Sequence, residues 1–298
     1  MSHANVMSDA ASGAGSRSPY ASVVSELTDD LGQDTITLLG YPDIAVRIQR
    51  ALVDENVSAQ QLVRLVGSEP VLTSRILCMA NSVALNPRGS PVADLASAIR
   101  RMGLNQLRGA VASYAMAQVR ATRELQVVAQ PLRELWQKSV VVAALCGALA
   151  RNHSKVNPDL ALLTGLLHSV GKLYLLIKSS RHPEVLADDS TQSELACDWH
   201  VTIASTLLEQ WKLPAAIVEA VSEYEYFDSD AEHVELNLTG ILYLSTVMID
   251  EIQDPEQFDM LMSSNQALTR FGISAEQCRQ LVSESEREIA GVMESLGL

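Results

Sequence analysis

The stretch LALLTGLLHSVGKLYLLI, residues 160–177, is the most apolar part of the chain and decides how the rest is interpreted. It has nearly the length of a membrane-spanning helix, but His168, Gly171 and Lys172 interrupt it near its middle. A polar break between two apolar runs of helical length favours a pair of helices buried in a globular core. We therefore expect helices at 158–167 and 171–179, and no membrane span.

Helix boundary signals precede this pair. Pro42 and Pro70 each stand where a helix can begin, because proline is tolerated in the first turn of a helix. Ser58 and Gln61 form a capping-box pattern ahead of an apolar run, which Gly67 can close. These signals predict three consecutive helices between residues 42 and 81.

The remaining segments also have helical spacing, and none alternates apolar and polar residues with a period of two. We expect a helix over 93–102 that ends at Gly103, with Asn105 as the cap of the next helix. The predicted fold class is all-α, built as two packed helical bundles. The other expected helices cover 131–152, 193–211, 214–224, 236–252 and 274–296.

Composition divides the chain into four parts. Residues 1–20 are rich in Ser, Ala and Gly, and we expect a disordered tail. The polar segment 118–130 precedes Pro131, which places a boundary there. The predicted units are an N-terminal helical subdomain at 21–130, a second helical subdomain at 131–253 and a C-terminal helical extension at 254–298.

The net charge of the chain excludes some classes of binding partner. Against 22 Lys and Arg stand 36 Asp and Glu, which gives a formal net charge of -14. Such a chain repels phosphate backbones and anionic lipid, so we expect neither nucleic acid nor a membrane as partner. Arg100, Arg101 and Arg108 are the best candidates for a local basic patch, although solvating a helix is the simpler interpretation.

The cysteines and the N-terminus point to a reducing compartment. The four cysteines are far apart and form no CxxC pair, so neither a disulfide framework nor a zinc knuckle is expected. The first twenty residues lack the apolar core of a signal peptide. The chain is therefore predicted to be cytoplasmic. The cysteines are Cys78, Cys146, Cys197 and Cys278.

Two histidines stand out because of where they fall. His168 ends the first helix of the apolar pair, and His200 lies in the amphipathic helix that follows. Two histidines separated by a helix hairpin can meet inside a bundle, where metal sites are built from facing side chains. On spacing alone, a hydrogen-bonded place in the core is the commoner outcome.

The sequence around these histidines resembles the HDOD family, a divergent branch of the HD-type metal phosphohydrolases found in bacterial signalling. The resemblance covers about residues 35–251 and implies that the C-terminal bundle, 131–253, is HD-like. Its N-terminal half is carried by LGYP at 39–42, EPVLTSRILCMANS at 69–82, AI at 98–99, MGL at 102–104 and LR at 107–108. Its C-terminal half is carried by LW at 135–136, GLLH at 165–168, GKL at 171–173, His200 and WKLP at 211–214.

The resemblance also implies which residues would hold a metal. HD enzymes use an early histidine, a His-Asp pair and a later aspartate to bind divalent metal, which activates a water molecule. The corresponding positions here are Lys138, His168-Ser169 and Thr246. Only His168 and His200 survive from the full set, so no metal and no other cofactor is expected. Lys138 could replace the charge of the lost metal.

One further pair of positions departs from the family. The paired histidines that often follow the Leu-Pro helix in HD enzymes are here Tyr224 and Glu225. Asp198, close to His200, is the one nearby carboxylate that could act as a replacement ligand. No phosphate-binding loop or nucleophile elbow is present elsewhere in the sequence.

The resulting functional prediction is a non-catalytic bacterial signal-transduction protein with a degenerate HD site. Its partners would be signalling proteins, with those of cyclic-dinucleotide pathways as candidates, and the last helix, 275–296, could form a homodimer. One alternative is a nucleotide or cyclic-dinucleotide sensor that uses the vestigial pocket. Another is a residual metal-dependent phosphohydrolase or phosphodiesterase.

Arg75 and Asn81 are two candidates for a ligand groove in the N-terminal half. Asn81 ends an apolar helix before a proline-rich loop, where it could line a groove or simply cap the helix. Arg75 lies within that helix and could bind an anion through two hydrogen bonds, or pair with a carboxylate of the protein itself.

Overall fold

The computed structural model describes residues 18–32, 36, 38–54, 56–82, 85–86, 91–226, 235–264 and 271–296, and every regular element among them is helical. The all-α prediction is confirmed. The first elements are α1 (Pro19–Gly32), α2 (Asp43–Val53), α3 (Ala59–Gly67), α4 (Pro70–Ala80) and α5 (Leu95–Ala121), followed by the 3-10 helix η1 (Arg123–Val128) and α6 (Ala129–His153). The others are α7 (Pro158–Leu167), α8 (Val170–Ser179), α9 (Pro183–Leu186), α10 (Asp189–Gln210), α11 (Ala215–Glu223), η2 (Tyr224–Tyr226), α12 (Leu238–Gln253), α13 (Pro255–Ser264) and α15 (Ala275–Leu296).

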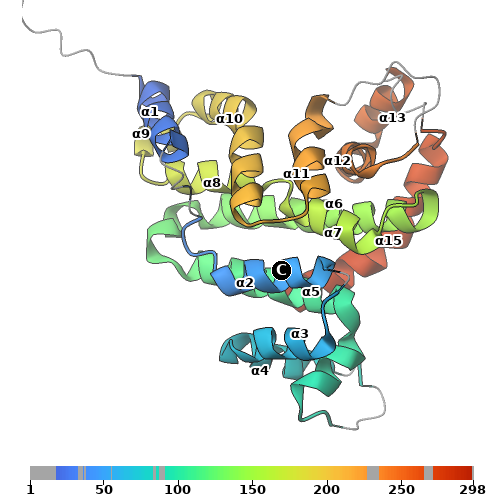
Figure 1. Cartoon of the computed structure of the whole chain (residues 1–298). Coiled ribbons are helices and arrows are strands. Elements are labelled where there is room, and N and C mark those ends of the chain that lie inside the picture. Colours follow the sequence, from blue (N-terminus) through green and yellow to red (C-terminus); the bar gives the residue numbers. More distant parts are fainter. Residues whose placement is uncertain are drawn as a thin grey trace, which may run out of the picture.

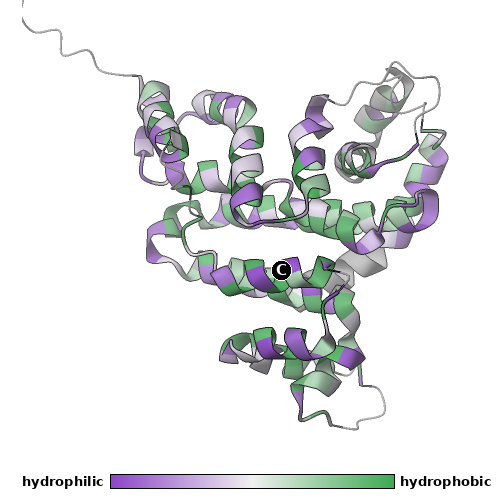
Figure 2. Cartoon of the chain, viewed as in Figure 1, coloured by the Kyte–Doolittle hydropathy of each residue, from purple (hydrophilic) through white to green (hydrophobic). Residues whose placement is uncertain are grey.

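Two groups of buried side chains form the core. The smaller group joins α2, α3 and α4 to α5, and its buried members run from Ala45 to Ala115. The larger group joins α1 and the end of α5 to all later helices. Figure 1 shows α2 to α4 below the long α6 and α7, with α8 to α12 above them, and Figure 2 shows the apolar residues along α6 and α7.

The apolar stretch that opens the sequence analysis forms two helices, as expected. α7 ends at Leu167 and α8 begins at Val170, so His168 and Ser169 form the corner between them. Residues 158–179 are long and apolar enough to cross a membrane, but 78% of the most apolar window is buried inside the fold. The pair is the centre of the core, and the helices at 158–167 and 171–179 were placed correctly to within one residue.

The capping signals near the N-terminus are confirmed. Ser58 and Gln61 form both hydrogen bonds of the capping box at the start of α3, which ends at Gly67. The expected helix end at Gly103 is confirmed, because Gly103 has the non-helical angles φ 76° and ψ 167° and divides Leu95–Ala121 into two helical segments that meet at a kink. The side chain of Asn105, the expected cap of the second segment, lies outside the described ones. Asp94 caps this element by accepting a hydrogen bond from the Ser97 N–H. Glycine has no Cβ and adopts this backbone conformation at little cost.

Arg108 differs from its predicted place on the surface. Its side chain is 1% exposed, and its guanidinium lies 2.6 Å from a carboxylate oxygen of Asp159 and donates to the Leu52 carbonyl at 2.6 Å. Leu52 lies in the last turn of α2, whereas Asp159 lies in the first turn of α7. The positive charge thus meets a helix C-terminus and the negative charge a helix N-terminus, which the helix dipoles favour. The pair joins the smaller core group to the larger one.

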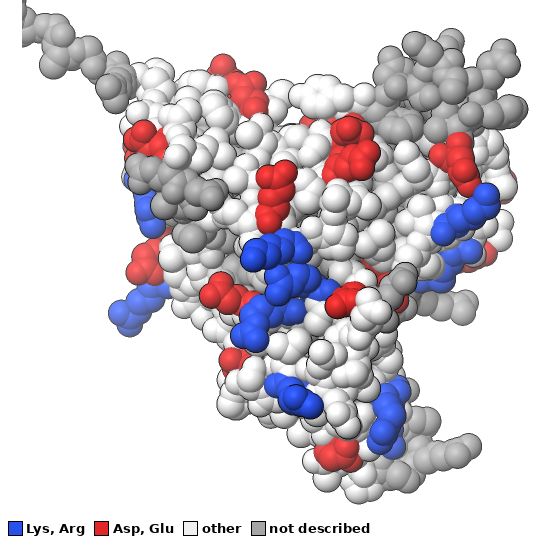
Figure 3. Space-filling view, in the orientation of Figure 1, with Lys and Arg blue, Asp and Glu red and all other residues white. Residues whose placement is uncertain are grey.

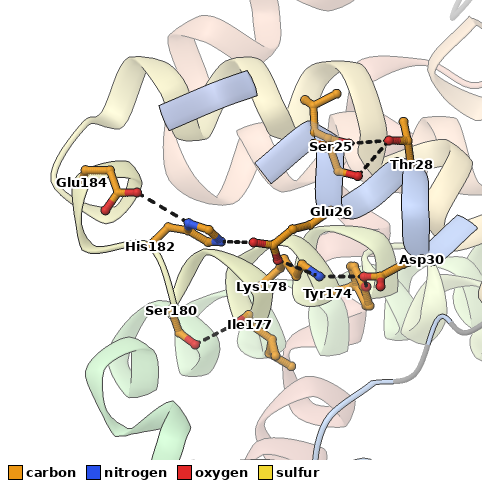
Figure 4. Close-up of polar contacts among 11 residues, drawn as sticks. Ser25, Glu26, Thr28, Asp30, Tyr174, Ile177, Lys178, Ser180, His182 and Glu184 are labelled. Atoms are coloured by element: carbon orange, nitrogen blue, oxygen red, sulfur yellow. Dashed lines mark hydrogen bonds and ion pairs between the residues drawn. The ribbon is translucent and has the colours of Figure 1, made fainter. Parts of the chain in front are cut away.

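Helix α1 packs on the C-terminal part of the chain. Lys178 of α8 lies between two carboxylates of α1, at 3.0 Å from Glu26 and 2.7 Å from Asp30. Tyr174 of α8 also donates to Asp30 at 2.6 Å, and His182 lies 3.1 Å from Glu26, as Figure 4 shows. The sequence placed residues from 21 onward in the N-terminal subdomain and the tail at 1–20; the helix begins at Pro19, and residues 1–17 lie outside the described ones.

The other predicted boundaries lie within the packed body. η1 passes directly into α6 at Ala129, so the chain has no loop at the boundary expected near Pro131. α15 packs against α6 and α5, and it buries Cys278, Leu281 and Val282 in the larger core group. The side chains after Ser285, on which a dimer through this helix would depend, lie outside the described ones.

Candidate functional site

His168 lies buried at the corner between α7 and α8. Its Nδ1 is 2.6 Å from the Gly165 carbonyl, to which it can only donate, so the Nε2 carries no proton in the neutral ring. Its ring meets the Tyr224 ring edge to face, with centroids 6.0 Å apart. Burial lowers the pKa of His168 to about 4. His168 is therefore neutral at physiological pH.

His200 is engaged at both of its ring nitrogens. Nδ1 lies 2.5 Å from the Ala196 carbonyl one turn earlier in α10, and Nε2 lies 2.9 Å from Oε1 of Glu225. A carboxylate oxygen can only accept, so Nε2 donates the hydrogen bond to Glu225. The hydrogen bond from His200 lowers the pKa of Glu225 to about 2. The two residues form a charge-assisted pair.

Two more side chains hold Glu225 in place. The Tyr224 hydroxyl donates to the same Oε1 at 2.8 Å, and burial raises the pKa of this phenol. The ammonium of Lys172, on α8, lies 3.5 Å from Oε1. Glu225 is thus the centre of a network that joins α8, α10 and η2. We refer to His168, Lys172, His200, Tyr224 and Glu225 as the histidine cluster.

Ser169 pairs with a second serine rather than with a metal ligand. Its Oγ lies 2.5 Å from Oγ of Ser139, a buried residue of α6. The cavity beside the two hydroxyl groups has a volume of about 10 Å³, with Trp136 and Tyr41 among its lining residues. A space of that size holds at most one water molecule.

The position of His200 depends on a glycine. Gly171 lies in the first turn of α8, where the backbone of α8 meets that of α10. A Cβ at this position would lie 1.9 Å from the His200 carbonyl oxygen and 3.0 Å from the Ala204 nitrogen. Only a residue without a side chain allows this approach, which explains the Gly-Lys-Leu motif at 171–173 in physical terms.

The LGYP and WKLP motifs meet in space. Tyr41 stacks on Trp211, with centroids 5.2 Å apart and planes 18° from parallel. α10 ends beside this stack with Lys212 in the left-handed conformation at φ 54°, and the Leu213 N–H bonds back to the Leu208 carbonyl. The stack of Tyr41 on Trp211 places the N-terminal segment against the end of α10, so the two motifs contribute to packing.

Two residues that the resemblance assigned to the site, and the candidate replacement ligand, form no hydrogen bond or ion pair with the histidine cluster in the described part of the chain. Lys138 is exposed on α6, beside the buried Ser139. Thr246 donates to the Tyr243 carbonyl of its own helix at 2.7 Å. Asp198, the candidate replacement ligand, is exposed and accepts a hydrogen bond from the Tyr20 hydroxyl at 2.6 Å, which directs it to α1.

Of the two residues predicted as candidates for a ligand groove, Asn81 caps a helix and Arg75 is partly buried. The Asn81 side-chain amide donates to the Leu77 and Val92 carbonyls at 3.0 and 2.8 Å, and accepts from the Val92 N–H at 2.8 Å. It therefore caps α4 and holds the far end of the following loop. Arg75 is half-buried on α4 and has an interaction partner.

These donors do not fit a catalytic divalent metal. Over the described ranges, no three His, Cys, Asp or Glu side chains are placed to hold one metal ion. The Nε2 of His200 is taken by Glu225, and Ser169 offers a neutral hydroxyl where a bridging carboxylate is required. Hard cations such as Mg²⁺ and Mn²⁺ prefer carboxylate and water oxygens.

The two pKa shifts predict how stability depends on pH. Glu225 has a depressed pKa, so its contribution to folding is complete above its ordinary value of 4.5 and is lost as the pH falls toward about 2. Substituting Glu225→Gln should therefore reduce the loss of unfolding free energy between about pH 5 and about pH 3. Urea unfolding at the two pH values measures this difference.

His168 serves as the comparison for Glu225, because it changes the stability of the fold over a different pH interval. Its folded pKa of about 4 lies below the ordinary 6.5, so protonation of the unfolded chain lowers stability as the pH falls through that interval. His168→Asn keeps a donor for the Gly165 carbonyl and should flatten the curve above pH 4 only. An unchanged acid dependence in Glu225→Gln would contradict the His200–Glu225 pairing.

Sequence reasoning missed most of the histidine cluster. Glu225 and Tyr224 were noted only as replacements for family histidines, and Lys172 only as a polar interruption. The available signal was the placement of an acidic residue at a position where the family often has a histidine. A carboxylate there can bond to His200, whereas a histidine would bind metal.

Comparisons with known proteins fit this geometry. A family model described as "HDOD domain" matches residues 38–226. An uncharacterized protein of Treponema pallidum (strain Nichols) is 25% identical over 223 residues, which is 67% of this chain and 39% of that protein. The chain therefore spans 39% of the length of this relative.

Solved structures share the fold. A provisionally assigned metal-dependent phosphohydrolase from Shewanella amazonensis SB2B has a TM-score of 0.65 and 23% identity, covering 94% of this chain and 100% of that one. A provisionally assigned signal transduction protein from Marinobacter aquaeolei VT8 has a TM-score of 0.67 and 22% identity, covering 93% and 66%. An HDOD domain protein with unknown function from Geobacter sulfurreducens has a TM-score of 0.59 and 19% identity, covering 91% and 96%.

Proposed function

The chain belongs to the HDOD domain family, and from this premise we propose that it is a non-catalytic signal-transduction module that acts through protein partners. Its HD-like half keeps the helical frame of a phosphohydrolase. The donor set within that frame has become a hydrogen-bonded core. The frame then serves to present a surface rather than to hold a metal.

One observation carries the proposal. Nε2 of His200, the nitrogen that a metal would need, donates to the Glu225 carboxylate at 2.9 Å, while Nδ1 is held by its own helix. Glu225 is held in turn by Tyr224 and Lys172. A metal would have to displace this network, and His168 Nε2 and the neutral hydroxyl groups of Ser139 and Ser169 would then be its other donors, with no carboxylate among them.

The same geometry argues against a nucleotide sensor in the vestigial pocket. The cavity next to Ser139 and Ser169 has about 10 Å³, whereas pockets for small ligands have about 300–1,000 Å³. A ligand there would need the helices of the HD-like half to separate. Signalling as the role is supported by the description of the similar Marinobacter aquaeolei protein and by the acidic net charge of -14, which suits a protein partner.

Hydrolysis assays test the absence of catalysis. The metal-stripped chain, supplied with Mn²⁺ or Fe²⁺, is expected to cleave bis(p-nitrophenyl) phosphate and cyclic dinucleotides no faster than its His168→Ala variant. The physical reason is that the Glu225 carboxylate is engaged by His200 and Tyr224 and that Ser169 supplies no carboxylate to hold a metal and its activated water. Metal-dependent cleavage by the unsubstituted chain, lost in His168→Ala, would show that the site is still an enzyme.

A further inference from the structure

A groove between α2 and α3 gathers three arginine side chains. Arg47 and Arg50 come from α2 and Arg64 from the last turn of α3, and all three line one cavity of about 520 Å³. All three are exposed. Figure 3 shows Lys and Arg side chains gathered over α2, near the middle of a face where acidic side chains surround them.

The fold does not use these guanidinium groups. Within the described part of the chain, none of the three forms a hydrogen bond or an ion pair. The two helices are held instead by buried apolar residues, which include Ile48 and Leu62. Three cations that face one space repel one another, and a bound anion would remove that repulsion.

The other residues that line the groove indicate which class of ligand it can bind. Asp54 lines the same groove, and its Oδ1 accepts from the Asn56 N–H at 2.9 Å, which leaves the second oxygen as an acceptor. Ala51, Val57 and Leu65 contribute apolar surface. We propose that this groove binds a nucleotide-like ligand: a phosphate ester that also carries a planar ring and hydroxyl or amino groups.

Each part of such a ligand has a counterpart in the groove. Arginine binds phosphate through two parallel hydrogen bonds, and its planar group also stacks on rings. Asp54 can accept from a hydroxyl or amino group, and the apolar residues can lie against the ring. The cavity volume is within the range of about 300–1,000 Å³ found for small-ligand sites.

A small ligand fits these residues better than an acidic peptide does. Asp54 repels a carboxylate and a phosphate alike, but a nucleotide also carries hydroxyl and amino groups that can donate to Asp54, whereas glutamate side chains carry no such donor. The groove shares no residue with the histidine cluster. The inference therefore stands apart from the proposed function and can fail or succeed without it.

Calorimetric titration of the full chain tests the proposal with AMP, GMP, inorganic phosphate and a polyglutamate peptide. The test variant is Arg47→Gln/Arg50→Gln. The matched control is Arg123→Gln/Arg133→Gln, which removes the same charge from exposed positions on η1 and α6. We expect AMP or GMP to bind one per chain, with affinity roughly tenfold weaker for each groove arginine removed and unchanged in the control.

Asp54→Asn separates a nucleotide from bare phosphate. It should weaken nucleotide binding, because a charged acceptor becomes a neutral amide, and strengthen the binding of inorganic phosphate by removing a repulsive charge. The proposal is overturned if neither nucleotide binds, if the control loses as much affinity as the test variant, or if only the peptide binds. An equal response of nucleotide and phosphate to Asp54→Asn would also overturn it.

Discussion

Replacing Arg108 by alanine is expected to lower the free energy of unfolding by about 3–5 kcal/mol, because it removes one partner of a buried ion pair. The guanidinium is 1% exposed and bonded to Asp159 and to the Leu52 carbonyl, both at 2.6 Å. Without it, a partly buried carboxylate and a carbonyl at the end of α2 lose their partner. Urea unfolding of the variant measures the loss.

Arg100→Ala is the matched control for this substitution. Arg100 lies in α5 before the kink at Gly103 and is exposed, and in the described part of the chain its side chain bonds locally, to the Ser97 hydroxyl at 2.9 Å. Its removal should change the unfolding free energy by no more than about 0.5 kcal/mol. If Arg108→Ala reduced the unfolding free energy as little as the control does, the contacts of Arg108 with Asp159 and Leu52 would not hold the two core groups together.

Gly171→Ala is expected to destabilise the fold by about 3 kcal/mol, although alanine is the better helix former. The new methyl group would meet the His200 carbonyl oxygen at 1.9 Å, and that atom belongs to the backbone of a long helix. α8 and α10 would have to separate, and His200 would move away from Glu225. Unfolding experiments report the loss, and the imidazole resonances of His200 report the displacement.

Gly109→Ala tests whether the close approach is the cause. Gly109 lies within α5, and a Cβ there would meet nothing within 4 Å. This substitution should leave stability unchanged or raise it by up to about 1 kcal/mol, because alanine restricts the unfolded chain. A similar loss in both variants would show that the close approach to His200 is not the cause, because helix propensity favours alanine at both positions.

Local chemistry made the helices predictable from the sequence. The Ser58–Gln61 capping box, the glycine after α3 and the corner at His168–Ser169 each depend on neighbours within a few residues, so the sequence contains the whole signal. α1 was missed because its apolar positions lie beside a tail rich in Ser and Gly. Its anchoring by Lys178 and Tyr174 comes from residues about 150 positions away.

The candidate site could be predicted only in outline. The resemblance to the family pattern was enough to predict that Ser169 and Thr246 stand where HD enzymes have metal-binding carboxylates. The hydrogen-bond partner of His200 could not be predicted in the same way, because the contact of Glu225 with His200 depends on how η2 folds back over α10. Arg108 shows the same limit: an arginine in an amphipathic helix is expected in solvent until a distant Asp159 is known to meet it.

The claim that the site binds no metal is tested most directly by titrating Mn²⁺ into the metal-stripped chain. The solution EPR signal of the free ion is measured at each addition. Binding removes that signal in proportion to the ions bound. We expect the signal to remain that of free Mn²⁺, because Glu225 holds His200 and Ser169 supplies no carboxylate. Loss of one ion's signal per chain, restored by His168→Ala, would contradict the account and return the protein to the metal-dependent phosphohydrolases.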